Sequence, residues 1–239
     1  MKKRSATSTE HPATIQQMFN AIAPTYDLLN HLLSFGLDIH WRRRAVRLLS
    51  EKRGGTILDI ATGSGDLSLE VLRIRPRIVV STDFAQTMLN VFQEKLGKRN
   101  IREAISLASC DALHLPFRDE SFDATMVAFG IRNFADRARS LREMMRVLKP
   151  NGIAVILELS APRKPVVLQF YNLYSQIGLP LFGKIISRNH EAYRYLPESI
   201  STFPDRDEFL SLMLQAGFVD NRAIPLTFGV ATIYVGRKK

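Results

Sequence analysis

The sequence predicts an α/β fold built around one mostly parallel sheet. Between residues 56 and 158, short apolar runs alternate with helical patterns, the order that builds β-α-β units. The apolar, β-branched run from Thr56 to Ile60 leads into a glycine turn, Gly63 to Gly65. A second apolar run, residues 78–82, ends in Asp83. A strand, a glycine loop, a helix and a second strand with a terminal acid are together typical of a nucleoside-binding half-fold.

The expected elements follow from this alternation. We predict strands near 56–60, 78–82, 105–109, 123–128 and 152–158, and helices near 66–74, 86–96 and 136–148. Beyond them, Asp205 to Ala216 predicts a capped amphipathic helix, and Gly217 suits the position after its end. Strand-like runs near 219–227 and 230–236 meet at Phe228-Gly229, which predicts a hairpin. The hairpin adds an antiparallel strand, and we expect a seven-stranded sheet.

We expect one domain over residues 1–239, because this length suits a single core. Two helical additions flank the predicted sheet, namely an N-terminal cover near 12–50 and an insert near 160–204. Ligands of open α/β sheets bind beyond the carboxyl ends of the strands, where the strand order reverses. Both additions are therefore candidates to cover a substrate there. Four predicted strand ends should converge on that crevice, at Asp59, Asp83, Asp111 and Ala128.

Composition excludes several classes of protein. The hydrophobic content of 46% is that of a globular chain. A single cysteine, Cys110, cannot form an intrachain disulfide and suits a reducing compartment, so we expect a cytoplasmic protein. Residues 1–14 are polar and charged, unlike a secretory signal. No unbroken apolar stretch reaches about 18 residues, so no transmembrane helix is expected.

Positive charge is concentrated near the N-terminus. The net charge is +10, and residues 1–55 hold nine Lys or Arg against four acids. Trp41 stands beside Arg42, Arg43 and Arg44, so this basic block could meet anionic lipid or nucleic acid, or simply solubilise a helix face. A nucleic-acid-binding protein would interleave aromatic with basic residues, and this block offers only Trp41. We therefore expect no nucleic-acid partner.

The glycine loop alone is a weak signal, because a tight turn also explains Gly-x-Gly. Support comes from Asp83 and from residues 111–117, which follow the third predicted strand. A dinucleotide-dependent oxidoreductase shares the turn, but it expects a third glycine where Ser68 stands. Asp59 and Asp66 would also repel a pyrophosphate at the start of the next helix. These residues therefore argue against a pyrophosphate ligand.

Together these segments resemble class I S-adenosylmethionine-dependent methyltransferases, across about residues 55–158 and the C-terminal hairpin. The resemblance implies a Rossmann-like fold with S-adenosylmethionine as cofactor, a zwitterion without phosphate that tolerates acids around the loop. It implies that the loop lies against the cofactor's amino-acid part, that Asp83 binds the ribose hydroxyls and that Asp111 binds the adenine amino group. The implied cofactor-binding residues are Asp59, Thr62, Gly63, Ser64, Gly65, Asp83, Phe84, Asp111, Ala112 and Ala128.

A narrower resemblance covers nearly the whole chain, from about Met18 to the C-terminus. It rests on Tyr26-Asp27-Leu28-Leu29-Asn30, Trp41-Arg42-Arg43, Phe129-Gly130-Ile131-Arg132-Asn133 and Tyr193-Arg194-Tyr195-Leu196-Pro197. This set is similar to the ubiquinone/menaquinone biosynthesis C-methyltransferases. The resemblance implies C-methylation of a prenylated hydroquinone, converting demethylmenaquinol to menaquinol, with 2-polyprenyl-6-methoxybenzoquinol as the alternative substrate. The chain departs from the family at Leu29, Thr62, Ala128 and Asn151, where methionine, glycine, serine and glycine are usual.

The same resemblance suggests which residues act on the substrate. Arg132 and Asn133 should face both substrate and cofactor, where Arg132 would stabilise a developing phenolate. Tyr26 and Asp27 would orient the ring or accept a proton. The alternatives are a helix-entry cap with a surface salt bridge for the first pair, and a packing motif for the second. Candidate substrate contacts are Asn30, Phe129, Tyr171, Tyr174 and Tyr195.

The sequence also bears on metals, membranes and assembly. No His, Cys or acidic cluster has metal-ligand spacing, so no metal site is expected. The insert carries an apolar stripe on one helical face, which forms either buried core or a greasy entrance for a prenyl chain. Its residues are Val167, Phe170, Tyr171, Tyr174 and Ile177. We predict a peripheral protein that docks on the cytoplasmic membrane face through the basic N-terminal region and this insert, and we allow for a homodimer.

Overall fold

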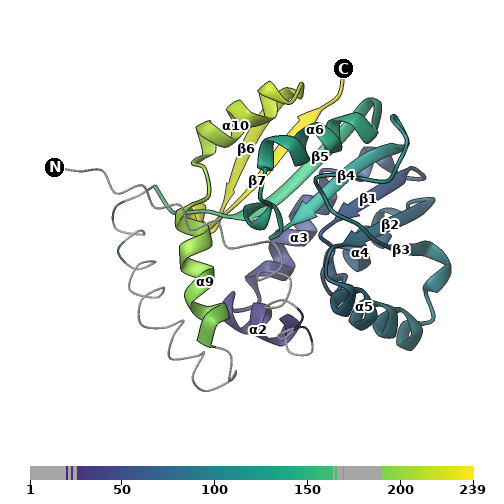
Figure 1. Ribbon diagram of the computed structural model, residues 1–239, viewed down its shortest axis with the longest axis horizontal. Helices are drawn as coiled ribbons and strands as arrows, with labels where there is room; N and C mark the ends of the chain where they lie inside the picture. The colour runs from purple at the N-terminus through teal and green to yellow at the C-terminus, as the bar shows by residue number, and fades with distance from the viewer. Residues whose placement is uncertain (1–19, 21–22, 24–25, 164, 166–168, 170–189) are drawn as a thin grey trace.

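The computed structural model describes residues 20, 23, 26–163, 165, 169 and 190–239. They form a sheet of seven strands in the order β3-β2-β1-β4-β5-β7-β6, flanked by helices (Figure 1). The strands are β1 (Thr56–Ile60), β2 (Ile78–Asp83), β3 (Ile105–Ser109), β4 (Phe122–Ala128), β5 (Leu148–Leu159), β6 (Val219–Leu226) and β7 (Ala231–Arg237). β7 runs antiparallel to its neighbours β5 and β6, and β1 to β5 pair in parallel. The expected α/β fold is confirmed.

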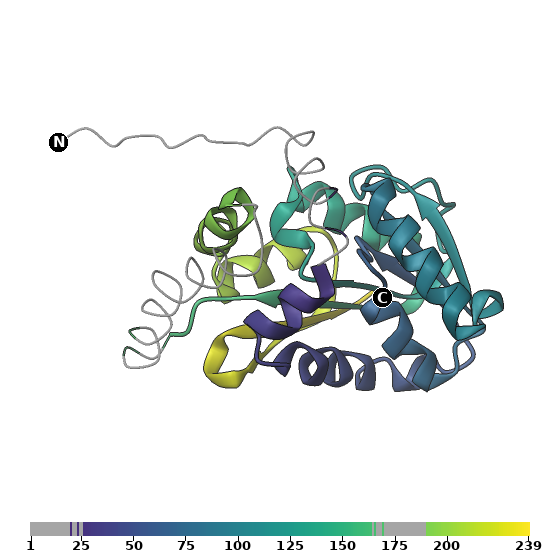
Figure 2. The same ribbon diagram turned by 90° about the horizontal axis from the view of Figure 1, so that it is seen from below.

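The helices lie on both faces of the sheet. They are α2 (Tyr26–Leu33), α3 (Leu37–Arg47), α4 (Asp66–Val71), α5 (Gln86–Arg99), α6 (Arg137–Val147), α9 (His190–Ser201) and α10 (Arg206–Gln215). Helices α3, α4 and α5 pack on one face through Trp41, Leu67 and Phe92. Helices α6 and α10 pack on the other face through Leu141 and Phe209. Figure 2 shows α3 and α10 on opposite sides of the strands.

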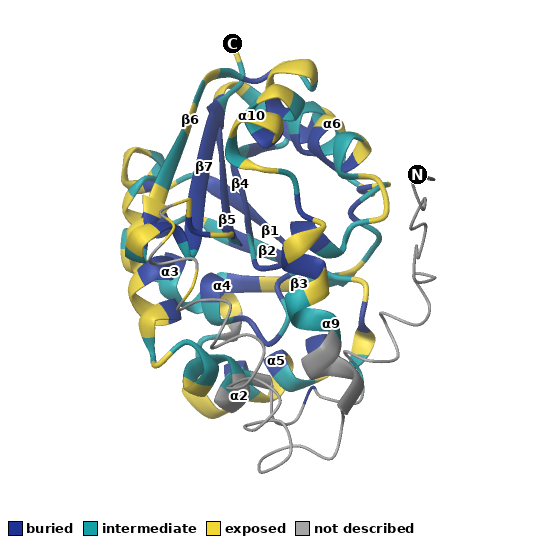
Figure 3. Cartoon of the chain, turned by 90° about the vertical axis from the view of Figure 1, so that its left-hand side faces the viewer, coloured by how far each residue is buried: buried dark blue, intermediate teal, exposed yellow. Residues whose placement is uncertain are grey.

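Strand β1 lies at the centre of the sheet. All of its residues are buried, which explains why its sequence is a nearly continuous apolar run and not an alternation. Figure 3 shows the same burial along β4, β5 and β7. The chain moves outward from β1 to β2 and β3 on one side, and returns to β4 and β5 on the other. This reversal is where an open α/β sheet binds its ligand, and the glycine loop follows β1 directly.

One strand boundary differs from the sequence prediction. β5 begins at Leu148 and not near residue 152, so the strand itself carries Pro150 and Asn151. Helix α6 ends earlier, at Val147, because proline disfavours the helical conformation in the residue before it. The pairing with β4 shifts in register there, and Asn151 takes a φ of 61°, which asparagine tolerates. The proline is therefore accommodated at a β-bulge.

Helix α10 begins and ends as predicted. The Asp205 carboxylate accepts hydrogen bonds from the backbone N–H groups of Asp207 (2.8 Å) and Glu208 (3.0 Å). The Glu208 carboxylate in turn accepts one from the Asp205 N–H at 3.0 Å. This reciprocal capping box satisfies donors that the start of a helix leaves without partners. Gly217 follows the helix with a φ of 100°.

The N-terminal cover is seen as α2 and α3, with one correction to the sequence prediction. Trp41 and Arg42 point into the protein, with 2% and 7% of their surfaces exposed. An exposed basic block that includes Trp41 is therefore wrong, although Arg43 and Arg44 are exposed. Of the expected insert, the structure describes α9, which continues through Pro197. Among the helices described, none is long and apolar enough to cross a bilayer.

The packing of the loop requires a glycine at position 65, and two substitutions test this. Gly65 has a φ of 89°, and a Cβ there would lie 2.1 Å from the Phe92 ring. Gly54 also has a positive φ, 74°, but its Cβ would meet nothing within 4 Å. We expect Gly54→Ala to lose about 1 kcal/mol of unfolding free energy through backbone strain. Gly65→Ala should lose about 1–3 kcal/mol more through overpacking. Chemical denaturation measures both losses, and equal losses would contradict the packing argument.

Candidate cofactor and substrate site

The glycine loop turns sharply between β1 and α4. Ala61, Gly63 and Gly65 take positive φ values of 53°, 56° and 89°. Thr62 lies between them outside the left-handed region, and its N–H donates to the Thr82 carbonyl at 2.9 Å. The left-handed positions therefore fall on either side of Thr62. This explains how a threonine can stand where glycine is usual.

Asp83 ends β2 and is held by the loop that follows β1. Its Oδ2 accepts a hydrogen bond from the Gly63 N–H at 2.8 Å, and its Oδ1 accepts one from the Ala85 N–H at 2.8 Å. Burial raises the pKa of this carboxyl group, against the lowering effect of those backbone donors. Each oxygen keeps a lone pair for another donor, such as a ribose hydroxyl. Phe84, the next residue, is 47% exposed beside it.

Asp59 is a fully buried carboxyl group with one oxygen unsatisfied. Its Oδ2 accepts hydrogen bonds from the hydroxyl groups of Thr62 (2.7 Å) and Ser68 (2.5 Å). Its Oδ1 has no hydrogen-bond partner in the described part of the chain. Burial raises the pKa of Asp59 to about 7. Ser68 also bonds Ser81, so the residue that replaces the third glycine of a dinucleotide loop serves to hold Asp59.

These features fit the amino-acid part of S-adenosylmethionine. A small cavity lies against the loop, and Asp59 and Ala128 both contribute to its walls. The complete lining is Arg42, Asp59, Ala61, Thr62, Gly63, Ser64, Asp66, Leu67, Ala128 and Phe129. A buried acceptor that lacks a donor is costly, and an ammonium group is a donor that would satisfy it.

Asp111 lies two residues beyond β3. Its Oδ1 accepts a hydrogen bond from the Leu113 N–H at 2.9 Å, and 46% of its side chain is exposed. The adjacent Cys110 N–H donates to the Asp83 carbonyl at 3.2 Å, which holds the two loops together. Ala112 is buried in the core beneath α6. Asp111 is therefore accessible next to Asp83, and its contact with adenine stays a prediction.

Helix α2 contacts the glycine loop through Asp27. The Asp27 carboxylate accepts a hydrogen bond from the Ser64 hydroxyl and pairs with Lys95 of α5. Lys95 also lies 3.1 Å from Asp66. Asp27 thus fastens the cover to the loop, which is the packing alternative, and its catalytic role stays a prediction. Tyr26 is the first residue of α2, and Asn30 lies half-buried on the same helix.

A second network fastens α3 to α4. His31, Asp38 and Asp66 lie within 4.8 Å of one another, a grouping that sequence spacing did not indicate. The Arg42 guanidinium pairs with Asp38 and lies 3.9 Å from Asp66, so it supplies the positive charge among them. Burial acts to raise the pKa of Asp38, but the Ser34 hydroxyl and Arg42 bring it below its usual value.

Phe129 follows β4 and joins this network to the sheet. Its φ is 58°, and its N–H donates to the Leu157 carbonyl at 2.8 Å. Its ring lies 5.3 Å from the Arg42 guanidinium and 6.2 Å from the Trp41 ring, measured to the ring centroid. Because it also lines the small cavity, Phe129 is placed to contact either cofactor or substrate.

Arg132 belongs to a buried ion pair and not to a surface salt bridge. It is 8% exposed, and its Nη1 lies 2.7 Å from Oε1 of Glu158, a fully buried residue near the end of β5. The backbone N–H of Arg132 also donates to Glu158 Oε2 at 3.1 Å. Asn133 accepts a hydrogen bond from the Tyr195 hydroxyl of α9 at 2.8 Å. The structure therefore brings together three predicted site residues, Arg132, Asn133 and Tyr195.

Glu158 and Arg137 were missed by the sequence analysis. The Arg137 Nη2 donates to the Arg132 carbonyl at 2.7 Å, and its Nε is buried with no hydrogen-bond partner among the described residues. Burial lowers the pKa of Arg137, while the charge of Glu158 opposes that shift. A single acid inside the apolar run 153–159 was the signal that could have revealed Glu158. The predicted contacts Tyr171 and Tyr174 lie outside the described residues.

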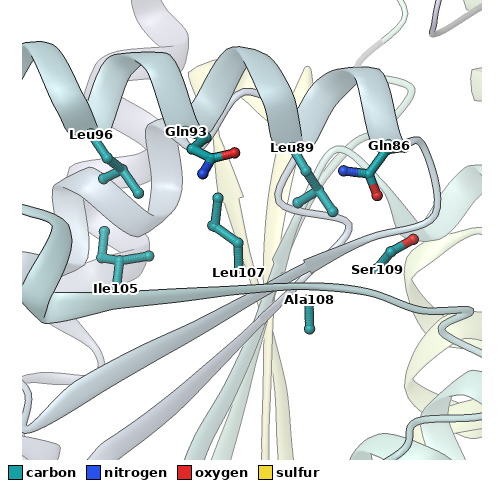
Figure 4. Close-up of a pocket in the computed structure, with 8 residues that line it drawn as sticks. All are labelled: Gln86, Leu89, Gln93, Leu96, Ile105, Leu107, Ala108 and Ser109. Atoms are coloured by element: carbon teal, nitrogen blue, oxygen red, sulfur yellow. The ribbon is translucent and has the colours of Figure 1, made fainter.

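A larger pocket, of about 390 Å³, lies between α5 and β3, outside this site (Figure 4). Leu89 and Leu96 of α5 lie on one side of it and Leu107 of β3 points toward them from the other, with Gln86 and Ser109 at one end. Among the described residues, those that line it carry no charge. It therefore offers neither the carboxylates nor the cations that the glycine loop and Arg132 present.

Comparison with known proteins supports this reading. A family model described as the ubiE/COQ5 methyltransferase family matches residues 5–238. The demethylmenaquinone methyltransferase of Thermus thermophilus is 49% identical over 220 residues, covering 92% of this chain and 99% of the relative. The ubiquinone/menaquinone biosynthesis C-methyltransferase of Geobacter sulfurreducens is 45% identical over 234 residues, covering 96% and 90%.

Solved structures agree on the fold. A crystal structure of a S-adenosylmethionine-dependent methyltransferase from Thermotoga maritima superposes with a TM-score of 0.64 at 17% identity. The match covers 93% of this chain and 100% of that one. The structural likeness confirms the class I methyltransferase fold, and the sequence matches over nearly the full length establish the narrower group. This chain belongs to the ubiE/COQ5 methyltransferase family.

Proposed function

We propose that this chain transfers the methyl group of S-adenosylmethionine to a ring carbon of a prenylated hydroquinone, converting demethylmenaquinol to menaquinol. The names of the relatives support this substrate, and the 49% identity to a demethylmenaquinone methyltransferase carries most weight. The relatives named for both ubiquinone and menaquinone keep a methoxybenzoquinol as the second candidate. An NAD-dependent oxidoreductase is disfavoured, because Ser68 stands where a pyrophosphate-binding loop needs its third glycine. The Ser68 hydroxyl is instead hydrogen-bonded to Asp59.

The loop residues would hold the cofactor by complementary charge and hydrogen bonding. S-adenosylmethionine supplies an electrophilic methyl group on a sulfonium when it is bound. Asp83 would accept hydrogen bonds from the ribose hydroxyls, and the unsatisfied Oδ1 of Asp59 would accept one from the ammonium group. Asp111 and Phe84 would contact adenine. Ala128 offers no hydroxyl group, so it would contribute only to the cavity wall.

The buried charges near β5 would act on the hydroquinone. Loss of a phenolic proton makes the ortho carbon nucleophilic, so the site must favour a negative oxygen. Glu158 pairs with the Arg132 guanidinium at 2.7 Å and also interacts by charge with the half-buried Arg137, so two cations accompany one carboxylate and leave one net positive charge. That charge would stabilise the phenolate. Tyr195 and Asn133 would position the ring beside it.

We also propose that the protein works in the cytoplasm against the membrane face, because a prenylated quinol is held in the bilayer. Homodimer formation stays an expectation from the sequence. The single experiment that tests the function is incubation of the purified protein with S-adenosylmethionine and either reduced demethylmenaquinone or the methoxybenzoquinol. Mass spectrometry should show a gain of one methyl group on the first, and no gain on either would contradict the proposal.

Asp83→Asn tests the ribose contact. Asparagine keeps one acceptor but loses the charge, so we expect the dissociation constant for S-adenosylhomocysteine to rise about tenfold or more. Isothermal titration calorimetry measures this. Asp119→Asn is the matched control, because that carboxylate is 72% exposed and pairs with Arg146. Similar affinity of the Asp83 variant and the control would remove Asp83 from the cofactor site.

Asp59→Asn tests the buried carboxyl group through pH. Because the folded-state pKa of Asp59 is raised to about 7, its contribution to stability is complete below the unfolded pKa and is lost as pH rises through 7. The variant cannot ionise there. The unfolding free energy of the parent protein should therefore fall relative to that of the variant as pH rises from 4 to 8. We expect this relative change to be at most about 4 kcal/mol. A difference that does not change with pH would contradict the assignment.

Arg132→Ala tests the phenolate-stabilising role. We expect S-adenosylhomocysteine affinity to stay within about twofold while turnover falls about a hundredfold or more. Removing one partner of a buried pair also destabilises, because Glu158 is left charged. The double variant Arg132→Ala, Glu158→Gln removes that charge and should fold better yet stay inactive. Recovery of turnover in the double variant would show that Arg132 acts only on stability.

A further inference from the structure

Large exposed apolar side chains gather at one end of the sheet. Seven such side chains are exposed in the described residues, and five of them lie in two turns or in the helix ends next to them. These five are Leu32, Phe35, Leu37, Ile39 and Phe228. Phe35 and Phe228 are 72% and 73% exposed. Such a concentration is unusual for a surface, where single apolar residues are normally scattered.

The two turns lie side by side. The first joins α2 to α3, and the second, residues 227–229, joins β6 to β7. The Trp41 Nε1 donates to the Thr227 hydroxyl at 2.8 Å, and Leu37 lies one helical turn before Trp41. Figure 2 shows the β6–β7 turn beside the start of α3. We call Phe35, Leu37 and Phe228 the apolar rim.

The rim lies at the same end of the sheet as the candidate site. Ala231, at the start of β7, pairs with Leu159, at the end of β5. The turn before Ala231 is therefore at the carboxyl end of the parallel strands, where the glycine loop and Asp83 also lie. The opposite end carries Leu214, an exposed apolar residue near the end of α10, which runs back before β6 begins.

Phe228 is exposed from a turn whose backbone conformation is strained. Thr227, Phe228 and Gly229 all have positive φ, at 43°, 57° and 97°. The left-handed region costs a non-glycine residue roughly 1–2 kcal/mol. Such strain is concentrated at sites of function, and here it holds an aromatic ring in water. An aromatic side chain held in this way is suited to enter an apolar phase.

The exposed charged side chains of α3 are all basic, and one of them, Arg43, has its Nε 3.7 Å from Oε1 of Glu70 on α4. On the outer side of α3, His40, Arg43, Arg44 and Arg47 are exposed. The two acids of residues 26–47 are turned inward, Asp27 to Lys95 and Ser64, and Asp38 to Arg42. The outer surface of this segment is thus apolar at one end and basic along its length. That pattern complements the anionic headgroups and acyl chains of a membrane surface.

We propose that the apolar rim and the basic side of α3 form the surface with which this protein docks on an anionic lipid bilayer. The proposal rests on the function given above, since it explains how a membrane-held quinol reaches a site at the same end of the sheet. Phe35, Leu37 and Phe228 enter the acyl boundary, and Arg43, Arg44 and Arg47 contact the headgroups. Nucleic acid is the competing partner, but stacking would need aromatics between the arginines.

Vesicle flotation of the full chain tests the surface. The probe is vesicles of phosphatidylglycerol and phosphatidylcholine in equal parts, with pure phosphatidylcholine as comparison. We expect Phe35→Ser and Phe228→Ser each to weaken binding about tenfold, and Leu214→Ser, at the opposite end, to leave it unchanged. Arg43→Gln with Arg44→Gln should also weaken binding about tenfold at low salt. Lys98→Gln with Arg99→Gln, exposed at the end of α5, is its matched control.

Three results would overturn the proposal. In the first, the rim variants float with vesicles as the parent protein does. In the second, the rim variants and the control variants lose equal amounts of vesicle binding. In the third, the arginine variants lose RNA binding but keep vesicle binding. Circular dichroism confirms that each variant is folded. Methylation of a short-chain, water-dispersed quinol separates this test from the function. The rim variants should keep that activity and lose activity on vesicle-held quinol. If neither the parent protein nor any variant methylates the quinol, but flotation still depends on the rim, the proposed function is contradicted and the docking surface is not.

Discussion

The hydrogen bond from the Gly63 N–H to the Asp83 carboxylate is the contact on which the site depends. β1 and β2 pair in parallel with Ile60 opposite Thr82, so the two strands end side by side. The loop that leaves one strand therefore reaches the acid that ends the other. The same carboxylate accepts the Ala85 N–H just before α5 begins. Asp83 thus fixes the ends of β1 and β2 relative to the glycine loop and to the start of α5. Helix α2 of the N-terminal cover then contacts this loop through Asp27.

This arrangement buries two carboxyl groups, and the described residues leave one oxygen of Asp59 without a donor. Burial raises the pKa of both Asp59 and Asp83, because it disfavours the charged form of each carboxyl group. A protein selected for stability alone would replace Asp59, whose Oδ1 lacks a donor. In the proposed cofactor site, the ammonium group would donate to Asp59 and offset that cost. Binding and folding would then be linked through the same carboxyl group.

Local patterns predicted most of the fold and the positions of the carboxyl groups around the glycine loop. The strands could be read because buried strands are apolar throughout, and the positions of Asp59 and Asp83 followed from strand ends that converge. The Glu158 ion pair could not be read, because its partner Arg132 is 26 residues away and nothing local distinguishes a buried arginine from an exposed one. For the same reason, the sequence suggested an exposed Trp41. Which side of α3 faces the protein is decided by Thr227, distant in sequence and adjacent in space.

The segment of α2 and α3 has two faces with opposite electrostatic tasks. Its acids point inward, where Asp27 meets Lys95 and Ser64 and where Asp38 meets Arg42. Arg42 and Trp41 are also buried, whereas Arg43, Arg44 and Arg47 are exposed on the outer side. An acid on the outer face would repel anionic lipid, and one fewer on the inner face would leave a buried cation unpaired. A single short segment can therefore contact the glycine loop with one side and carry Phe35 and Leu37 of the rim on the other. This requires the helical period to place its acids on the inner side and its exposed arginines on the outer side.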